Sequence, residues 1–152
     1  MTPQEQKFWD RFRSAMDIET AEPADIFRFG DSAAMSNELL DLVLSGRKRA
    51  TCALARWYGP GLAPLPVAGA LCVILDGDDQ PRCVIRTASV ELRPVRAVEA
   101  DFARDEGEGD LSLEWWRAAH LEFWQREANR EGFTFSEDLD ALLHRFVLVW
   151  SE

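Results

Sequence analysis

The feature that most constrains the fold is a pair of apolar, strand-like segments in the middle of the chain, at residues 70–75 and 81–90. A polar stretch, Asp76-Gly-Asp-Asp-Gln80, separates them and predicts a hairpin turn. Within the second segment, the residues on both faces are largely apolar or small. Such a strand faces the interior of a curved sheet on one side and is covered by helices on the other. The pattern therefore predicts a closed or nearly closed β-barrel with helices around it.

Two helical patterns precede these strands. Thr2 and Pro3 predict the start of the first helix, which carries large apolar residues at helical spacing to about residue 18. A polar connector follows over residues 19–25. Asp31 and Ser32 can cap a second helix, and Gly46 ends it where a left-handed residue is usually needed.

The remaining pattern predicts further strands and helices but no second domain. We expect strands at 27–29, 51–57, 133–135 and 144–150, and helices at about 98–105, 113–130 and 137–143. The fold class is α+β with mostly antiparallel strands. Since no repeat or long linker is present, residues 1–25 are assigned to an N-terminal helix and connector, and residues 26–152 to one structural unit.

Charge argues against a protein that attracts long nucleic acids. The chain has 27 acidic and 17 basic residues, a formal net charge of −10, so its overall field repels a polyanion. RNA binding would need a local basic groove and would be weak and salt-sensitive. The middle third offers cations for such a groove: Arg47, Lys48, Arg49, Arg56, Arg82, Arg86, Arg93 and Arg96.

The cysteines and the hydropathy predict a cytoplasmic protein. Cys52, Cys72 and Cys83 form no CxxC pair, and each lies in a strand-like apolar segment, so buried reduced thiols are the simplest interpretation. No apolar run approaches the roughly 18 residues that cross a bilayer. The polar N-terminus is not typical of a secretory signal. We therefore expect a soluble chain without membrane partners.

The first candidate for chemistry is the turn Gly46-Arg-Lys48-Arg-Ala-Thr51. On a turn that leaves a helix, positions 48 and 51 can point the same way, which sets an amine beside a hydroxyl. Burial lowers the pKa of a lysine, so Lys48 could act as a base for a hydroxyl or a water. From spacing alone, the simpler alternative is favoured: a solvated cation that complements the helix dipole.

The second candidate is the glycine-broken acidic stretch Glu106-Gly-Glu-Gly-Asp110. Its carboxylates could relay protons or hold a divalent cation. The alternative is a solvated acidic loop. Because the spacing lacks the fixed offsets of an EF-hand, a metal is not favoured, and no cofactor is predicted.

The third candidate is Trp115-Trp116-Arg117-Ala-Ala-His120 in the longest predicted helix. Arg117 and His120 could grip a phosphate, and an exposed tryptophan could stack on a base. The aromatic stripe is more typical of a helix core. No Walker motif, dinucleotide glycine fingerprint or nucleophile elbow is present.

Taken together, these sequence motifs resemble those of the longer members of the ASCH family, a branch of the PUA-like superfamily. The resemblance rests on Phe29-Gly-Asp-Ser32, on Gly46-Arg-Lys-Arg-Ala-Thr51, and on Phe102-Ala-Arg-Asp-Glu-Gly-Glu-Gly-Asp110 followed by Trp116-Arg117 and His120. It runs from about residue 26 to the C-terminus. The chain departs from the small amidohydrolases of the family in its N-terminal helix, its loop 59–69 and its enlarged aromatic helix.

The resemblance implies a PUA-like β-barrel with an RNA-binding cleft beside the Gly-x-Lys loop. Small members deacylate modified cytidines with a lysine, a threonine and a glutamate, which correspond here to Lys48, Thr51 and Glu106. Longer members are associated with RNA cleavage.

The leading hypothesis is therefore a hydrolase that acts on RNA or a modified nucleoside in a basic cleft. Lys48 or Glu106 would move the proton, and Thr51 or a water would attack. The residues assigned to substrate binding are Arg47, Arg49, Arg86, Arg117 and His120. The alternative is a non-catalytic module that binds RNA or senses a nucleotide. The oligomeric state is left open.

Overall fold

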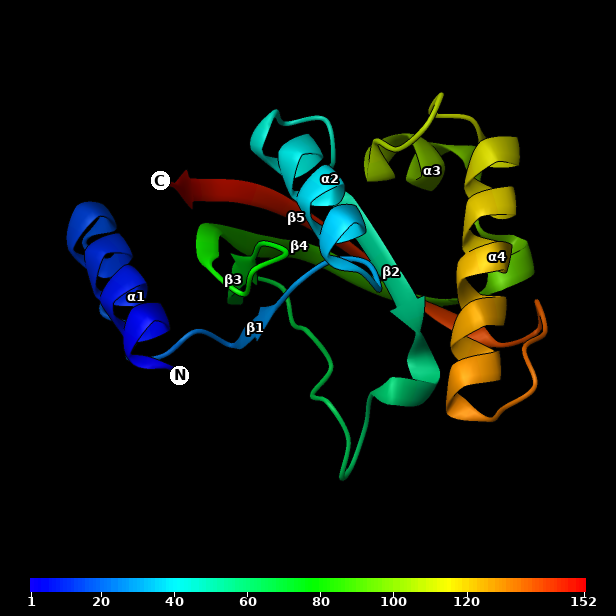
Figure 1. The fold of residues 1–152 in the computed structure, drawn as a ribbon, viewed down its shortest axis with the longest axis horizontal. Helices are drawn as coiled ribbons and strands as arrows, with labels where there is room; N and C mark the ends of the chain where they lie inside the picture. The colour runs from blue at the N-terminus through cyan, green and yellow to red at the C-terminus, as the bar shows by residue number, and fades with distance from the viewer.

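The computed structural model describes residues 1–152 and shows a five-stranded sheet that curls into a half-barrel (Figure 1). Along the sheet the strands are β1 (Asp25–Phe27), β3 (Leu71–Leu75), β4 (Pro81–Pro94), β5 (Asp140–Ser151) and β2 (Ala50–Leu54). β1 pairs with β3 in parallel, and all other pairs are antiparallel. Since β1 and β2 are the edge strands, the barrel is open between them. The predicted α+β class is confirmed.

Four α-helices surround this sheet: α1 (Pro3–Met16), α2 (Ala33–Leu44), α3 (Ala100–Glu106) and α4 (Leu113–Glu131). Two short 3-10 turns, η1 (Ala55–Trp57) and η2 (Val95–Ala97), follow β2 and β4. Thr2 and Ser32 cap α1 and α2 as expected, and Ser112 caps α4; each hydroxyl accepts a hydrogen bond from the first turn of its helix. In Figure 1, α1 lies at one end of the molecule, and α3 and α4 lie at the other.

Both faces of the β3–β4 hairpin are buried, as its two-sided apolar pattern predicts. Val73 and Val84 pack on one face against the aromatic side chains of α1, in one apolar cluster. On the other face, Ile74 and Ile85 belong to a cluster with Leu40 of α2. A third cluster joins α3 and α4 to β2 and β5.

The prediction fails in the segment that follows α4. Residues 133–135 form no strand, and the helix expected at 137–143 is absent because β5 already begins at Asp140. The pairing of β5 with β4 explains the difference. β4 continues to Pro94, and Leu142 of β5 pairs with Leu92 of β4. Local pattern is overridden by this long-range pairing. Phe133 packs edge-on against Trp57 instead of joining a strand.

Smaller boundary errors occur in the first half of the chain. The extended segment expected at 27–29 is β1, two residues earlier, and the strand expected at 51–57 ends at Leu54 before η1. The three cysteines lie on strands and are free, as predicted. None of the helices combines the length and the apolar character that a bilayer-spanning segment requires.

Candidate active site

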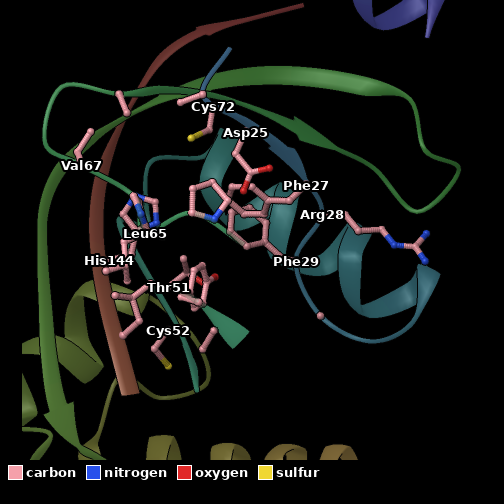
Figure 2. Close-up of a pocket in the computed structure, with 18 of the residues that line it drawn as sticks. Asp25, Phe27, Arg28, Phe29, Thr51, Cys52, Leu65, Val67, Cys72 and His144 are labelled. Atoms are coloured by element: carbon pink, nitrogen blue, oxygen red, sulfur yellow. The ribbon is translucent and has the colours of Figure 1, made fainter. Parts of the chain in front are cut away.

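Two neighbouring cavities lie beside β2. The polar cavity, about 430 Å³, lies between α2, β2 and α4 and is lined by Lys48, Glu106, Glu108 and His120 among others. The apolar chamber, about 490 Å³, lies between the two edge strands and loop 58–67 (Figure 2). Both volumes lie in the range of small-molecule sites.

Lys48 is a buried cation and not the solvated one that its spacing alone favours. Its side chain is 1% exposed. Its Nζ donates to Glu108 Oε2 at 2.8 Å and lies 3.8 Å from Glu106 Oε2. Nζ also donates to the backbone carbonyl of Glu106 at 3.4 Å. The amine that follows α2 and the acids at and just after the end of α3 therefore meet in one pocket.

Gly107 allows this meeting because two backbone segments touch there. It ends α3 with φ +72°, in the left-handed region. A Cβ built on Gly107 would lie 2.2 Å from the carbonyl oxygen of Arg47 and 2.9 Å from the Cα of Lys48. The backbone N–H of Arg49 also donates to the carbonyl of Asp105 at 2.7 Å. Only glycine permits so close an approach.

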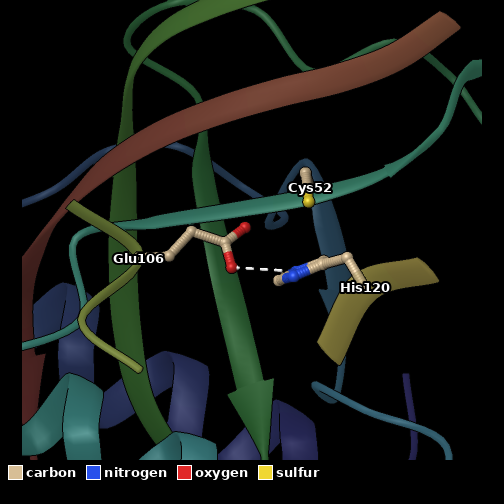
Figure 3. A group of neighbouring side chains, drawn as sticks. All are labelled: Cys52, Glu106 and His120. Carbon is tan, nitrogen blue, oxygen red and sulfur yellow. Dashed lines mark ion pairs between the residues drawn. The ribbon is translucent and has the colours of Figure 1, made fainter. Parts of the chain in front are cut away.

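His120 is held in an orientation that favours its charged form. Its Nε2 lies 3.0 Å from Glu106 Oε2 (Figure 3), and its Nδ1 lies 2.8 Å from the carbonyl oxygen of Trp116. Because a carbonyl and a carboxylate only accept, both ring nitrogens carry protons when Glu106 is ionised. Burial lowers the pKa of His120, but the Glu106 carboxylate outweighs burial, so the pKa is raised.

The two buried glutamates have opposite pKa shifts. Burial raises the pKa of Glu106, but Lys48 and then His120 outweigh burial, so its pKa is well below its usual range. Burial together with the nearby charge of Glu106 raises the pKa of Glu108 to about 7, against the opposing effect of Lys48. Glu106 thus stays ionised, while Glu108 exchanges a proton near neutral pH. Carboxyl groups whose pKa values are separated in this way are typical of acid–base catalysis.

The expected lowering of the Lys48 pKa is wrong. Burial does lower it, but the carboxylates of Glu106 and Glu108 together outweigh burial, and the pKa is raised. Lys48 therefore remains an ammonium ion at neutral pH. Its place in the pocket suits stabilisation of negative charge and not proton abstraction.

Thr51 and Cys52 lie on β2 where the two cavities adjoin, and both residues line both of them. The Thr51 hydroxyl forms no hydrogen bond with Lys48, Glu106 or Glu108. The Cys52 thiol, in contrast, points toward Glu106 and His120 (Figure 3). Burial and then the Glu106 charge raise the pKa of Cys52 well above its usual value, so this thiol is protonated.

Cys52, Glu106 and His120 could in principle offer donors to a metal ion, since their ligand atoms lie within 4.8 Å of one another. Sulfur, nitrogen and oxygen donors of this kind suit zinc. Binding would require the thiol and His120 Nε2 to release their protons. It would also place a second positive charge near Lys48, which already neutralises the carboxylates. The donor types fit zinc, but their protonation and the nearby ammonium do not.

The arginines assigned to substrate binding are distributed differently. Arg47 lies next to the polar cavity, where its guanidinium donates to the carbonyl of Gly109 at 2.7 Å. Arg49 pairs with Asp105 on the surface. Arg86 is exposed on β4, and Arg117 pairs with Glu137. None of these four arginines lines either cavity.

The expected basic cleft is therefore wrong. The cationic side chains of the polar cavity are Lys48, Arg126 and the protonated His120, and they face four glutamates: Glu38, Glu106, Glu108 and Glu122. Four arginines of the middle third instead form ion pairs at the surface: Arg49, Arg82, Arg93 and Arg96. Glu108, which the sequence offered only as one of the carboxylates of the acidic stretch, and Cys52 are the site residues that the sequence did not assign to the site. The position of Glu108 within the acidic loop was the available signal.

Comparisons with known proteins show the family of this chain. The model of the ASCH domain family matches residues 25–150. The crystal structure of an Enterococcus faecalis protein is similar at 35% identity with a TM-score of 0.86, covering 98% of this chain and 94% of that one. An ASCH domain from Lactobacillus crispatus is similar at 34% identity with a TM-score of 0.88, covering 97% and 95%. The curated proteins yield no match. ASCH domains are PUA-like folds associated with RNA, and this chain belongs to the ASCH family.

Proposed function

We propose that this protein is a hydrolase that removes an acyl group from a modified nucleoside. The observation that carries the proposal is the buried network of Lys48, Glu106, Glu108 and His120, which lines a cavity of small-molecule size. Two of its members are cations, one is a carboxylate, and one is a carboxyl group with a pKa of about 7. Such a set provides both charge stabilisation and proton transfer.

A nucleoside fits this site better than a long RNA strand. Lys48 and Glu106 are almost completely buried, so a substrate must enter the cavity to reach them. Arg49 and Arg117 are paired with acids outside the cavity, and the net charge of −10 repels a polyanion. RNA cleavage, the other activity considered, is therefore the less favoured one.

Three members of the network take part directly in amide hydrolysis, and Glu106 holds His120 in its charged form. Glu108 accepts the proton of the attacking group, which is a water or the Thr51 hydroxyl, as the new bond to the acyl carbon forms. The ammonium of Lys48 and the imidazolium of His120 stabilise the negative charge on the carbonyl oxygen. Glu108 then gives its proton to the leaving nitrogen as the C–N bond breaks. If Thr51 attacks, a water releases the acyl group as a carboxylic acid in a second round.

The test is hydrolysis of N4-acetylcytidine, followed by chromatography of the released cytidine. Glu108→Gln and Lys48→Met are expected to lower kcat/KM at least about a hundredfold, as loss of a proton-transfer or charge-stabilising group does. Glu114→Gln, which changes an exposed glutamate at the start of α4, serves as the control and should match wild type. Full activity in folded Glu108→Gln and Lys48→Met would refute the assignment.

A nucleotide-binding module without catalysis is the second candidate. It is favoured by the absence of a hydrogen bond between the Thr51 hydroxyl and any base of the network. Under this alternative, wild type binds N4-acetylcytidine without releasing cytidine, and Glu108→Gln binds it as well. Calorimetric titration beside the hydrolysis assay separates the two functions.

A further inference from the structure

The polar cavity and the apolar chamber share one wall. Five residues line both: Phe29, Gly30, Thr51, Cys52 and Phe123. The two cavities therefore adjoin at β2, and a molecule bound at the Lys48 network lies next to the apolar chamber. The shared wall includes the proposed nucleophile and lies where a scissile bond would have to be placed.

The two cavities differ in chemistry. Charged residues line the polar cavity, with the partly exposed Trp115 at its wall. The chamber is lined mostly by hydrophobic side chains, including Phe27, Leu142 and Val67. His144 is a polar member, which is 5% exposed and hydrogen-bonded to Thr87 at 2.8 Å. Burial lowers the pKa of His144 to about 4, so its imidazole is neutral at neutral pH. The charged residues of the chamber are Asp25, Arg28 and Glu127.

The outer wall of the chamber is built by the glycine- and proline-rich loop that distinguishes this chain from the small amidohydrolases. Residues 64–67 of this loop line the chamber (Figure 2). Leu65 and Val67 keep 48% and 63% of their surface exposed although both are apolar. Exposed apolar side chains at the mouth of an apolar cavity are typical of a binding site.

We propose that the apolar chamber is the subsite for the acyl group, and that the enzyme prefers nucleosides with a long or aromatic N-acyl substituent over acetylated ones. This inference rests on the proposed function. The nucleoside lies in the polar cavity, the scissile carbonyl lies at Thr51, and the acyl chain extends toward Leu142 and His144. An acetyl group would leave most of the 490 Å³ chamber unfilled.

The test compares kcat/KM for N4-acetyl-, N4-butyryl-, N4-hexanoyl- and N4-benzoylcytidine. Burial of each added methylene is expected to raise kcat/KM about fourfold until the chamber is full. Ala53→Phe fills the chamber from β2, and Ala70→Leu fills it independently if the first variant folds poorly. Either variant should bring the hexanoyl-to-acetyl ratio close to one. Ala118→Phe, an exposed position of α4 outside both cavities, is the matched control and should keep the wild-type ratio.

Wild-type rates that stay level or fall with acyl length would overturn the inference, as would an unchanged ratio in both filled variants. If no compound is hydrolysed, the proposed function is refuted. Affinities measured by calorimetry for the same four compounds then test whether the chamber binds the acyl group. Affinity that rises with acyl length in wild type, and no longer rises in Ala53→Phe or Ala70→Leu, would support the chamber as an apolar subsite. Equal affinities along the series would refute it.

Discussion

Replacing Lys48 with methionine should destabilise the protein by an amount that depends on pH. Methionine matches the volume of the lysine stem but removes the charge that lies 2.8 Å from Glu108 and 3.8 Å from Glu106. Removing one partner of a buried ion pair costs about 3 to 5 kcal/mol, because the remaining charge is buried without compensation. At about 2 to 4 °C per kcal/mol for a chain of this size, the melting temperature at pH 8 should fall by roughly 6 to 20 °C.

The sign of the pH dependence follows from the carboxyl groups. Without Lys48, the pKa values of Glu106 and Glu108 rise, so these groups take up protons as the pH falls and the uncompensated charge disappears. Urea denaturation should therefore show a larger difference between wild type and Lys48→Met at pH 8 than at pH 5.5. Arg49→Met breaks a surface pair with Asp105 and is the control, with an effect of at most about 1 kcal/mol. An equal loss at both pH values would refute the reasoning.

Three further outcomes are expected. The pKa of His144 is about 4 in the folded state, below its value in the unfolded state. As the pH falls, the unfolded state therefore binds a proton first, and the free energy of unfolding decreases between about pH 6.5 and pH 4. This loss is on the order of 3 kcal/mol and should be absent in His144→Gln when urea denaturation is followed across that range. Gly107→Ala should lower both the melting temperature and activity, because its Cβ meets the Arg47 carbonyl. Gly132→Ala has a similar positive φ but open space, so it should lose only the stability that the backbone strain costs, less than Gly107→Ala, and keep its activity. Incubation with EDTA should leave hydrolysis unchanged, and a loss that zinc restores would contradict the proton-transfer assignment.

The parts of the fold that the sequence predicted best are those with a strong local signal. The hairpin of β3 and β4 and the helices α2 and α4 follow from alternation, capping residues and glycine stops. The start of β5 was missed because Asp140–Leu143 carries no local strand signal beyond its pairing with β4. Non-local pairing of this kind is not visible in a short window of sequence.

Of the candidate site, the sequence predicted that Lys48 and Glu106 meet, but not the electrostatics around them. Spacing alone favoured a solvated Lys48, and only the resemblance to ASCH proteins joined it to Glu106, which is 58 residues away. Burial of Lys48 depends on the backbone contact at Gly107, which brings two distant loops together. The separate pKa shifts of Glu106 and Glu108 depend on that burial, so they follow only from coordinates.

The central claim is that Glu108 exchanges its proton near neutral pH while Glu106 remains ionised beside Lys48 and His120. Carbon-13 NMR of glutamate labelled at the carboxyl carbon, with Glu108→Gln used for assignment, measures this directly. The account predicts one buried carboxyl that titrates with a midpoint close to 7, and a signal for Glu106 that stays in its ionised position down to pH 4. Titration of both carboxyls together, with midpoints between 4 and 5, would contradict it.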